Sequence, residues 1–173
     1  IDPYSIVKEY GTDALRHFLI QHINPFEDSE FAMERFKERY NSDLANGLGN
    51  LVSRVMQLAE THLEKPVTEI IREEDERYQT DYVETIAVYR CDQASDYIFR
   101  EIDRIDSEIT NKKPFTVIKE DKEKGRVLIS EFVREVYRIS RLLRPFMPTT
   151  SDVIRATCLA NKKPENLFPR KDK

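Results

Sequence analysis

The stretch that decides the fold is FAMERFKERYNSDLANGLGNLVSRVMQLAETH, residues 31–62. Its apolar side chains recur every three or four residues, the spacing that places them on one face of an α-helix. They are Phe36, Tyr40, Leu44, Leu48, Leu51, Val55 and Leu58. An apolar face of this length must be covered by other elements, so the pattern predicts a long amphipathic helix packed on a core.

Similar stripes elsewhere predict the helices that cover this face. One runs through residues 82–111, as two consecutive helices or one bent helix, and another through residues 121–144 until Pro145. Thr149 and Asp152 resemble a capping box for a last short helix that ends near residue 160. No alternating segment longer than four residues is present. The sequence therefore predicts an all-α protein, a bundle of four to five helices.

Glycine and proline residues that end predicted helices divide the chain into three parts. Residues 1–28 predict two short helices, separated at Gly11 and ended by Asn24 and Pro25, and residues 29–160 form the bundle. Residues 69–76 read as an acidic, solvated connection, and residues 112–115 as a loop in which Pro114 forces an extended conformation on the residue before it. Residues 161–173 form a polar tail. Because the chain opens on Ile-Asp-Pro and not on Met, we expect a piece of a longer protein.

Composition narrows the classes of function. The 173 residues include 28 basic and 32 acidic ones, for a net charge of −4, and only four glycines. Glycine-rich nucleotide folds are disfavoured, and any nucleic-acid contact must use a local basic patch. No apolar stretch is long enough for a membrane span, and no secretory signal is visible, so we expect no membrane partner and a cytoplasmic location.

Catalytic and metal-binding patterns are missing from the sequence. There is no Gly-x-Ser-x-Gly motif, no phosphate-binding glycine loop and no His-Glu-x-x-His motif. Cys91 and Cys158 are isolated, and the histidines (His17, His22 and His62) stand at no metal-ligand spacing from either. We therefore expect no catalytic residue, no cofactor and no metal within this chain.

A glycine-containing flank of the long helix is the first candidate site. Gly47 and Gly49 each cost about 1 kcal/mol relative to alanine inside a helix. On α-helical geometry Gly47, Asn50 and Arg54 share one flank beside the apolar stripe. An amide and a planar guanidinium one turn apart are suited to reading base edges and stacking on bases. The alternative is that the glycines only allow close helix packing and that the polar residues are solvated.

Phe115 is the second candidate. It follows Lys112 and Lys113, and an exposed aromatic ring beside two lysines could stack on an unpaired base while the lysines contact the backbone. The alternative is a ring that fills the core.

A basic series on the helix of residues 121–144 is the third candidate. Arg134, Arg138 and Arg141 recur at helical spacing and could lie along phosphates. The alternative pairs them with Glu131, Glu135 or the acidic helices.

Several motifs resemble a known family. IDPYSIVKEYGTDALRHFLI (residues 1–20) and NSDLANGLGNLVSR (residues 41–54) are similar to class I aminoacyl-tRNA synthetases of the methionine, isoleucine, valine and leucine group. NKKPFTVIKED (residues 111–121), LLRPFMPTT (residues 142–150) and KPENLFPR (residues 163–170) resemble the methionyl members. In that family the first motif follows the KMSKS loop of the catalytic domain, which this chain lacks.

The resemblance implies a role and a partner. Residues 1–28 would be a stem-contact segment after the missing catalytic domain, and residues 29–160 an anticodon-binding domain. Asn50 and Arg54 match the family residues that contact the anticodon, and Phe115 stands where the family has a stacking Trp. Asp106 replaces a usual Asn. The implied partners are the anticodon stem-loop of tRNA(Met) and the catalytic domain of the same parent chain.

The resemblance also implies the chemistry of the parent, a ligase that joins methionine to tRNA using ATP with Mg. This chain alone would be inactive. Two alternatives stay open: the anticodon-binding domain of an isoleucyl- or valyl-tRNA synthetase, and a stand-alone helical protein-interaction module.

Overall fold

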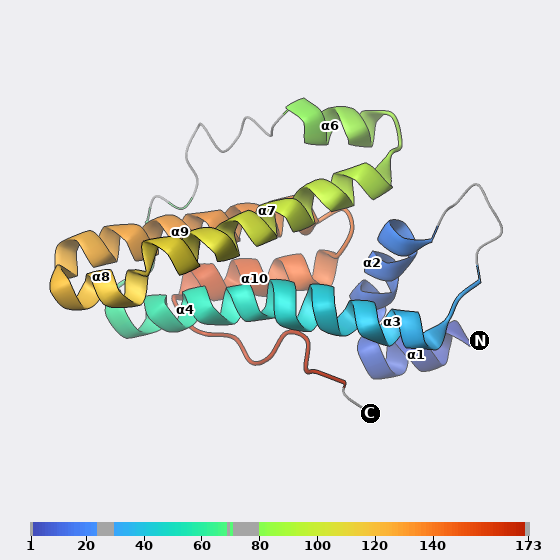
Figure 1. Ribbon diagram of the computed structural model, residues 1–173, viewed down its shortest axis with the longest axis horizontal. Helices are drawn as coiled ribbons and strands as arrows, with labels where there is room; N and C mark the ends of the chain where they lie inside the picture. The colour runs from blue at the N-terminus through green and yellow to red at the C-terminus, as the bar shows by residue number, and fades with distance from the viewer. Residues whose placement is uncertain (1, 24–29, 69, 71–79, 172–173) are drawn as a thin grey trace.

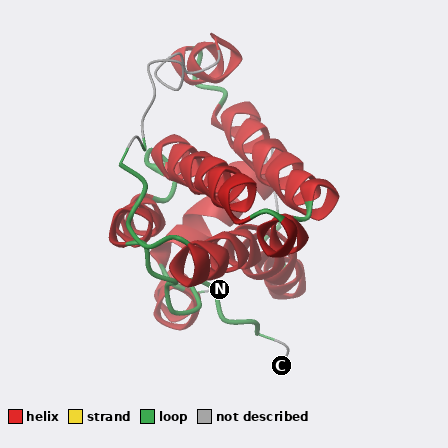
Figure 2. Ribbon diagram, turned by 90° about the vertical axis from the view of Figure 1, so that its left-hand side faces the viewer, coloured by secondary structure: helices red, strands yellow, loops and turns green. Residues whose placement is uncertain are grey.

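The computed structural model describes residues 2–23, 30–68, 70 and 80–171, and within them it contains helices and loops but no strand (Figures 1 and 2). The all-α prediction is confirmed. The helices, in chain order, are α1 (Pro3–Tyr10), α2 (Thr12–His22), α3 (Met33–Arg39), η1 (Tyr40–Gly49), α4 (Asn50–His62), α6 (Thr80–Ala87), α7 (Cys91–Lys112), α8 (Pro114–Glu120), α9 (Lys122–Leu143) and α10 (Pro148–Ala160). No helix in these described ranges is both long and apolar enough to cross a membrane.

The bundle consists of α4, α7, α9 and α10, which run along the long axis of the molecule, with α1 and α2 at one end and α8 at the other (Figure 1). α9 packs against α10, α8, α4 and α7, and α2 packs against α7. The predicted apolar stripes form the core, in which the side chains less than 2% exposed include Leu44, Leu48, Leu51, Val55, Ile98, Ile102, Ile105, Ile109 and Ile139. The sequence predicted a bundle of four to five helices, and the structure contains the short helices α6 and α8 in addition to the four long helices of the bundle.

The predicted long helix is continuous from α3 through η1 to α4, but its middle is a π-helix (Figure 1). A β-carbon at position 49 would lie 2.9 Å from the carbonyl oxygen of Leu44, so the wide turn requires a glycine at Gly49. π-Helical segments are rare and occur often at functional sites. The angular position predicted for Gly47 from α-helical geometry therefore does not hold, whereas Asn50 and Arg54 both lie in regular α4.

Long-range hydrogen bonds join the N-terminal helices to the bundle. The side chain of Asp13 accepts from the backbone N and the Oγ1 of Thr150, at 2.7 and 2.8 Å. The predicted capping box of the last helix is therefore wrong. α10 begins at Pro148 without a local side-chain cap. The carboxylate of Asp13, 137 residues away in the chain, instead accepts from one of the first N–H groups of α10. Arg16 Nε donates to the carbonyl oxygen of Phe146 at 2.7 Å.

The C-terminal tail packs back along η1. Tyr40 Oη donates to the carbonyl of Pro169 at 3.0 Å, and the Asn41 amide exchanges two hydrogen bonds with the backbone of Lys171. Phe168 of the tail is buried against η1, where its ring contacts that of Tyr40 with centroids 6.0 Å apart. The acidic connection predicted at residues 69–76 lies, apart from residue 70, outside the described residues.

Candidate functional site

Arg54 is held by a carboxylate from a neighbouring helix. Its Nη1 donates to Oδ1 of Asp106 on α7, in an ion pair whose side chains are 35% and 43% exposed. Partly exposed pairs of this kind contribute only about 0–1 kcal/mol to stability, so the main effect is to orient the guanidinium. Arg54 thus presents a fixed planar cation at the surface, with Asp106 in direct contact.

Asn50, one turn before Arg54, borders an open cavity of about 440 Å³ between α4 and the tail. The lining includes Ser53 on α4 and two tail residues, Asn166 and Arg170. Amide, hydroxyl and guanidinium groups are the donors and acceptors that read unpaired bases. Sequence reasoning missed the two tail residues, because only the fold brings residues 166–170 to α4; the similar motif at residues 163–170 was the one available signal.

Phe115 lies at the second position of α8 and its ring is 46% exposed. It is therefore at the surface and does not fill the core. The predicted loop is wrong: Lys113 has φ 45° and ψ 59°, a left-handed and not an extended conformation, and α8 begins at Pro114. Proline is tolerated at the first helical position, where its missing N–H would have no intrahelical partner.

Close packing on α9 fixes the helix that carries Phe115. A β-carbon at Gly125 would lie 2.4 Å from the Cα of Ile118, a distance too short for carbon atoms that are not bonded to each other. Ile118 and Pro114 are the buried residues of α8. α8 lies at the same end of the bundle as the C-terminal end of α4 (Figure 1). Asp106, which holds Arg54, lies six residues before Lys112, the last residue of α7, or about 9 Å along that helix, and α8 begins two residues after Lys112.

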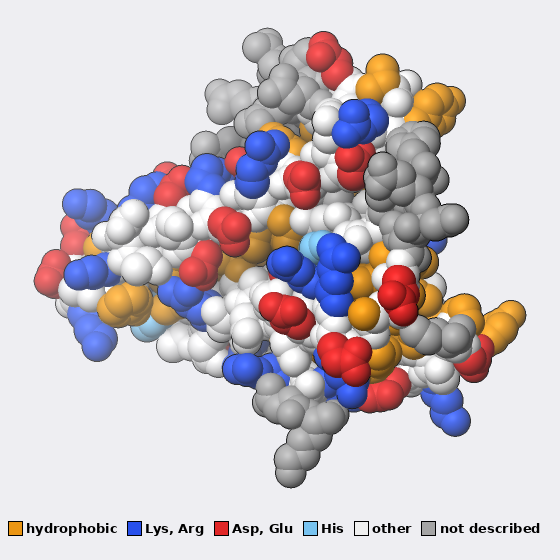
Figure 3. Space-filling view, turned by 45° about the vertical axis from the view of Figure 1, so that its right-hand side comes forward, with side chains coloured by type: hydrophobic (Ala, Val, Ile, Leu, Met, Phe, Trp, Pro, Cys, Tyr) orange, Lys and Arg blue, Asp and Glu red, His pale blue; other side chains and the backbone are white. Residues whose placement is uncertain are grey.

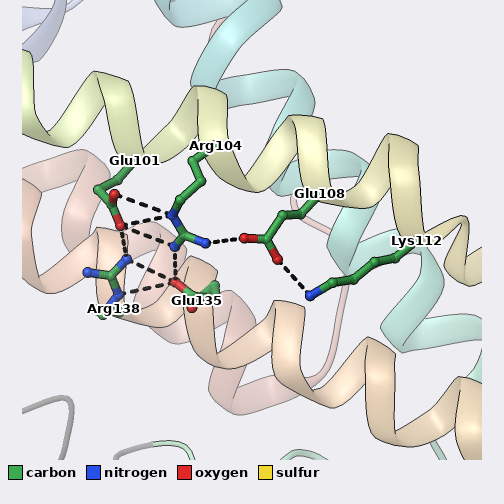
Figure 4. Close-up of polar contacts among 6 residues, drawn as sticks. All are labelled: Glu101, Arg104, Glu108, Lys112, Glu135 and Arg138. Carbon is green, nitrogen blue, oxygen red and sulfur yellow. Dashed lines mark hydrogen bonds and ion pairs between the residues drawn. The ribbon is translucent and has the colours of Figure 1, made fainter.

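The structure places Arg138 in an ion-pair network (Figure 4). Its Nη2 donates to Glu135 at 2.9 Å and to Glu101, and Arg104 donates to the same two glutamates at 3.1 Å. Burial opposes the charge of Arg138, but the bonds to Glu101 and Glu135 raise its pKa above the usual value. The side chain of Arg138 is 15% exposed and paired with two glutamates, as the second alternative for the basic series expects.

The other candidate cations differ in their surroundings. Lys113 is exposed at the α7–α8 junction, and Arg134 and Arg141 are partly exposed on α9. Lys112 Nζ donates to Glu108 at 2.7 Å, and this bond is the main cause of the lowered pKa of Glu108. Over the face drawn in Figure 3, Lys and Arg side chains are interspersed with Asp and Glu side chains. Contacts to a polyanion on that face would therefore be local.

Comparisons with known proteins show what the chain is similar to. The family described as "tRNA synthetases class I (M)" matches residues 1–56. The methionine–tRNA ligase of Clostridium acetobutylicum is 30% identical over 166 residues, which are 90% of this chain and 26% of that protein. That of Fusobacterium nucleatum is 28% identical over 165 residues, with 89% and 26% covered. The chain thus spans about a quarter of the length of these curated relatives.

A solved structure shares the fold. The crystal structure of the apo form of Mycobacterium tuberculosis methionyl-tRNA synthetase superposes with a TM-score of 0.79 at 20% identity, covering 100% of this chain and 41% of that one. In sequence the chain is similar to the class I aminoacyl-tRNA synthetases, and it shares its fold with a solved member of that class. Within that class the chain is related to the methionyl-tRNA synthetases, which confirms the resemblance found in the sequence.

Proposed function

We propose that this chain recognises the anticodon loop of tRNA(Met), as the tRNA-reading part of a methionyl-tRNA synthetase. The observation that carries the proposal is that Phe115 is about half exposed and that the guanidinium of Arg54, itself partly exposed, is oriented by Asp106. Stacking faces and fixed donors are what proteins use to read single-stranded loops.

In this proposal the anticodon bases splay out of the loop. One stacks on Phe115, and others present their edges to Arg54 and to Asn50. A guanidinium has five N–H donors, and Asp106 takes one through Nη1, so donors remain for a base. The cavity beside Asn50 offers room for a base edge near the tail.

Backbone contacts complete the proposed interface. Lys113, Arg134 and Arg141 are candidates to meet phosphates, and Lys112 would have to leave or share Glu108 to do so. Phosphate contacts give salt-dependent affinity without sequence preference. We therefore assign sequence preference to Asn50 and Arg54 and affinity to the cations.

For the parent enzyme we propose ligation of methionine to tRNA(Met) with ATP and Mg. A further Mycobacterium tuberculosis structure is of a methionyl-tRNA synthetase in complex with methionyl-adenylate, the activated intermediate of such a reaction. The motifs with which class I enzymes bind ATP are missing from the sequence printed here, so we propose that this chain alone is inactive. Residues 1–28 would connect to the catalytic domain, residues 29–160 would bind the anticodon, and the whole would act in the cytoplasm.

The test measures binding of a fluorescent anticodon stem-loop RNA with the anticodon CAU, by anisotropy at fixed salt concentration. Phe115→Ala should weaken binding about 5- to 150-fold, since loss of one base–aromatic stack costs about 1–3 kcal/mol. Tyr4→Ala is the matched control, because Tyr4 is an exposed aromatic residue on α1, and it should bind as the parent chain does.

Specificity is tested on the same RNA. Arg54→Lys should bind more weakly than the parent, because lysine keeps the charge but not the planar fork. A stem-loop with an isoleucine or valine anticodon should bind more weakly than CAU. Equal binding of all three anticodons, or parent-like binding by Phe115→Ala, would overturn the proposal, and no RNA binding at all would favour a protein-interaction module.

A further inference from the structure

Two histidines and an aspartate converge where α2 meets η1. Nε2 of His17 lies 3.3 Å from Oδ2 of Asp43, and Nε2 of His22 lies 2.9 Å from the same oxygen. The three ligand atoms all lie within 4.8 Å of one another. The spacing of the histidines gave no hint of this cluster, because residues five apart do not share a face of a regular helix and Asp43 comes from a distant element.

The cluster is rigid on its inner side. The side chain of His17 is 1% exposed, and its ring packs on Phe99 with ring centroids 4.5 Å apart. Ser42 Oγ donates to the second carboxylate oxygen of Asp43, which fixes the orientation of that group. Hydrogen bonds that hold a ligand from behind are a regular feature of metal sites.

The ligand set and spacing select the ion. Zinc takes nitrogen and carboxylate oxygen at about 2.0–2.2 Å in tetrahedral geometry, which puts neighbouring ligand atoms about 3.3–3.5 Å apart. The separations of 3.3 and 2.9 Å are close to that requirement. Magnesium and calcium prefer all-oxygen sites, so a pair of imidazoles disfavours them. His22 is the last residue of α2, where a small rotation can bring its ring toward His17.

The outer side of the cluster is open. His22 borders a cavity of about 790 Å³ whose walls include Ile23, Arg35 and Cys91. An ion can enter from this cavity, and a water molecule can take the fourth position. The side chains of His22 and Asp43 are 10% and 16% exposed, so the site is sheltered but reachable.

We propose that His17, His22 and Asp43 form a zinc site that fastens α2 to η1. The ion would join the N-terminal helices to the bundle by coordination bonds, in addition to the hydrogen bonds of Asp13 and Arg16. The site is independent of RNA binding, since its ligands lie on α2 and η1 and not on α4 or α8.

The test is calorimetric titration of the chelator-treated 173-residue chain with Zn²⁺ alone. We expect one equivalent to bind and the melting temperature to rise with zinc. His22→Gln keeps a hydrogen-bond donor for Asp43 and should lower the affinity at least tenfold and lose the zinc-dependent rise. His62→Gln is the matched control, because His62 ends α4 and is outside the cluster, and it should bind as the parent does.

Two measurements keep the outcome decisive. Circular dichroism without metal shows whether His22→Gln folds, and NMR on the parent shows whether the His17 and His22 imidazole signals shift on adding Zn²⁺. Absence of a one-equivalent event, unshifted imidazole signals, or equal affinity of His22→Gln and His62→Gln would overturn the proposal and leave a hydrogen-bonded cluster. A cobalt-substituted chain with a thiolate charge-transfer band would overturn this ligand set in favour of one containing Cys91.

Discussion

The contact between α8 and α9 gives the sharpest prediction, because one added methyl group tests it. In Gly125→Ala the new β-carbon would lie 2.4 Å from the Cα of Ile118 and 2.6 and 2.7 Å from its Cδ1 and Cβ. Carbon atoms in contact prefer about 3.5–4.0 Å, so the two helices must separate by about 1 Å or more. The backbone atom of Ile118 cannot move aside by changing a rotamer.

The expected free-energy change has two opposed parts. Alanine is favoured over glycine inside a helix by about 1 kcal/mol. Overpacking costs about 1–3 kcal/mol and more where the backbone must shift. Because here the backbone must shift, the clash exceeds the helix preference, and we expect a net loss of about 1–3 kcal/mol. In a domain of this size that loss lowers the melting temperature by about 2–12 °C.

Urea unfolding followed by circular dichroism measures this change, with Gly47→Ala as the control. The nearest atom to a β-carbon at Gly47 is the Ser42 carbonyl oxygen at 3.4 Å, so this substitution should be neutral or stabilising by up to about 1 kcal/mol. Gly125→Ala should also weaken RNA binding, because Phe115 lies on α8. A Gly125→Ala chain as stable as the parent would refute the packing argument.

Three further predictions concern separate features. Burial raises the pKa of Cys158 to about 12, so a thiol reagent at pH 8 should modify only the exposed Cys91, and two rapidly reacting thiols would contradict this. The free energy of unfolding should also fall as the pH rises above about 8.5, the pKa of the thiol in the unfolded chain. Arg138→Met should cost about 1–3 kcal/mol in urea unfolding, since it removes one of the two arginines that donate to Glu101 and Glu135 and leaves these partly buried carboxylates with Arg104 alone. Burial would raise the pKa of Glu101, but pairing with the two arginines lowers it overall. The stabilisation from the network is therefore lost as the pH falls below about 4.3, the pKa of an unperturbed Glu. On acidification Arg138→Met should lose less free energy of unfolding than the parent. Lys113→Gly should stabilise the chain by about 0.5–1 kcal/mol because glycine adopts the left-handed conformation without strain, and a lower urea midpoint would contradict that reason.

The residues of the proposed RNA site could be predicted from the sequence only in part. Asn50, Arg54 and Phe115 follow from motif and residue chemistry, and the structure confirms that the Phe115 ring is at the surface. The sequence did not show that Asp106 on α7 holds Arg54, although its departure from the usual Asn marked that position. The basic stripe was ambiguous for a physical reason: a helical period of arginines looks the same whether it faces phosphates or the glutamates of a neighbouring helix, as Arg138 does.

The sequence by itself determined the helices, because apolar side chains spaced every three or four residues can be read locally and the hydrophobic effect buries the helix face that carries them. It determined that residues 33–62 form one continuous helix, though not its π-helical middle, and that the isoleucines of α7 are buried. Only the tertiary structure decided the contacts between distant segments: Asp13 on the first turn of α10, the tail along η1, and the cluster of His17, His22 and Asp43. Periodicity fixes which face of a helix is buried but not which helix covers it. Polar groups at a helix end or on a wide turn find their partners only after the core has set the distances.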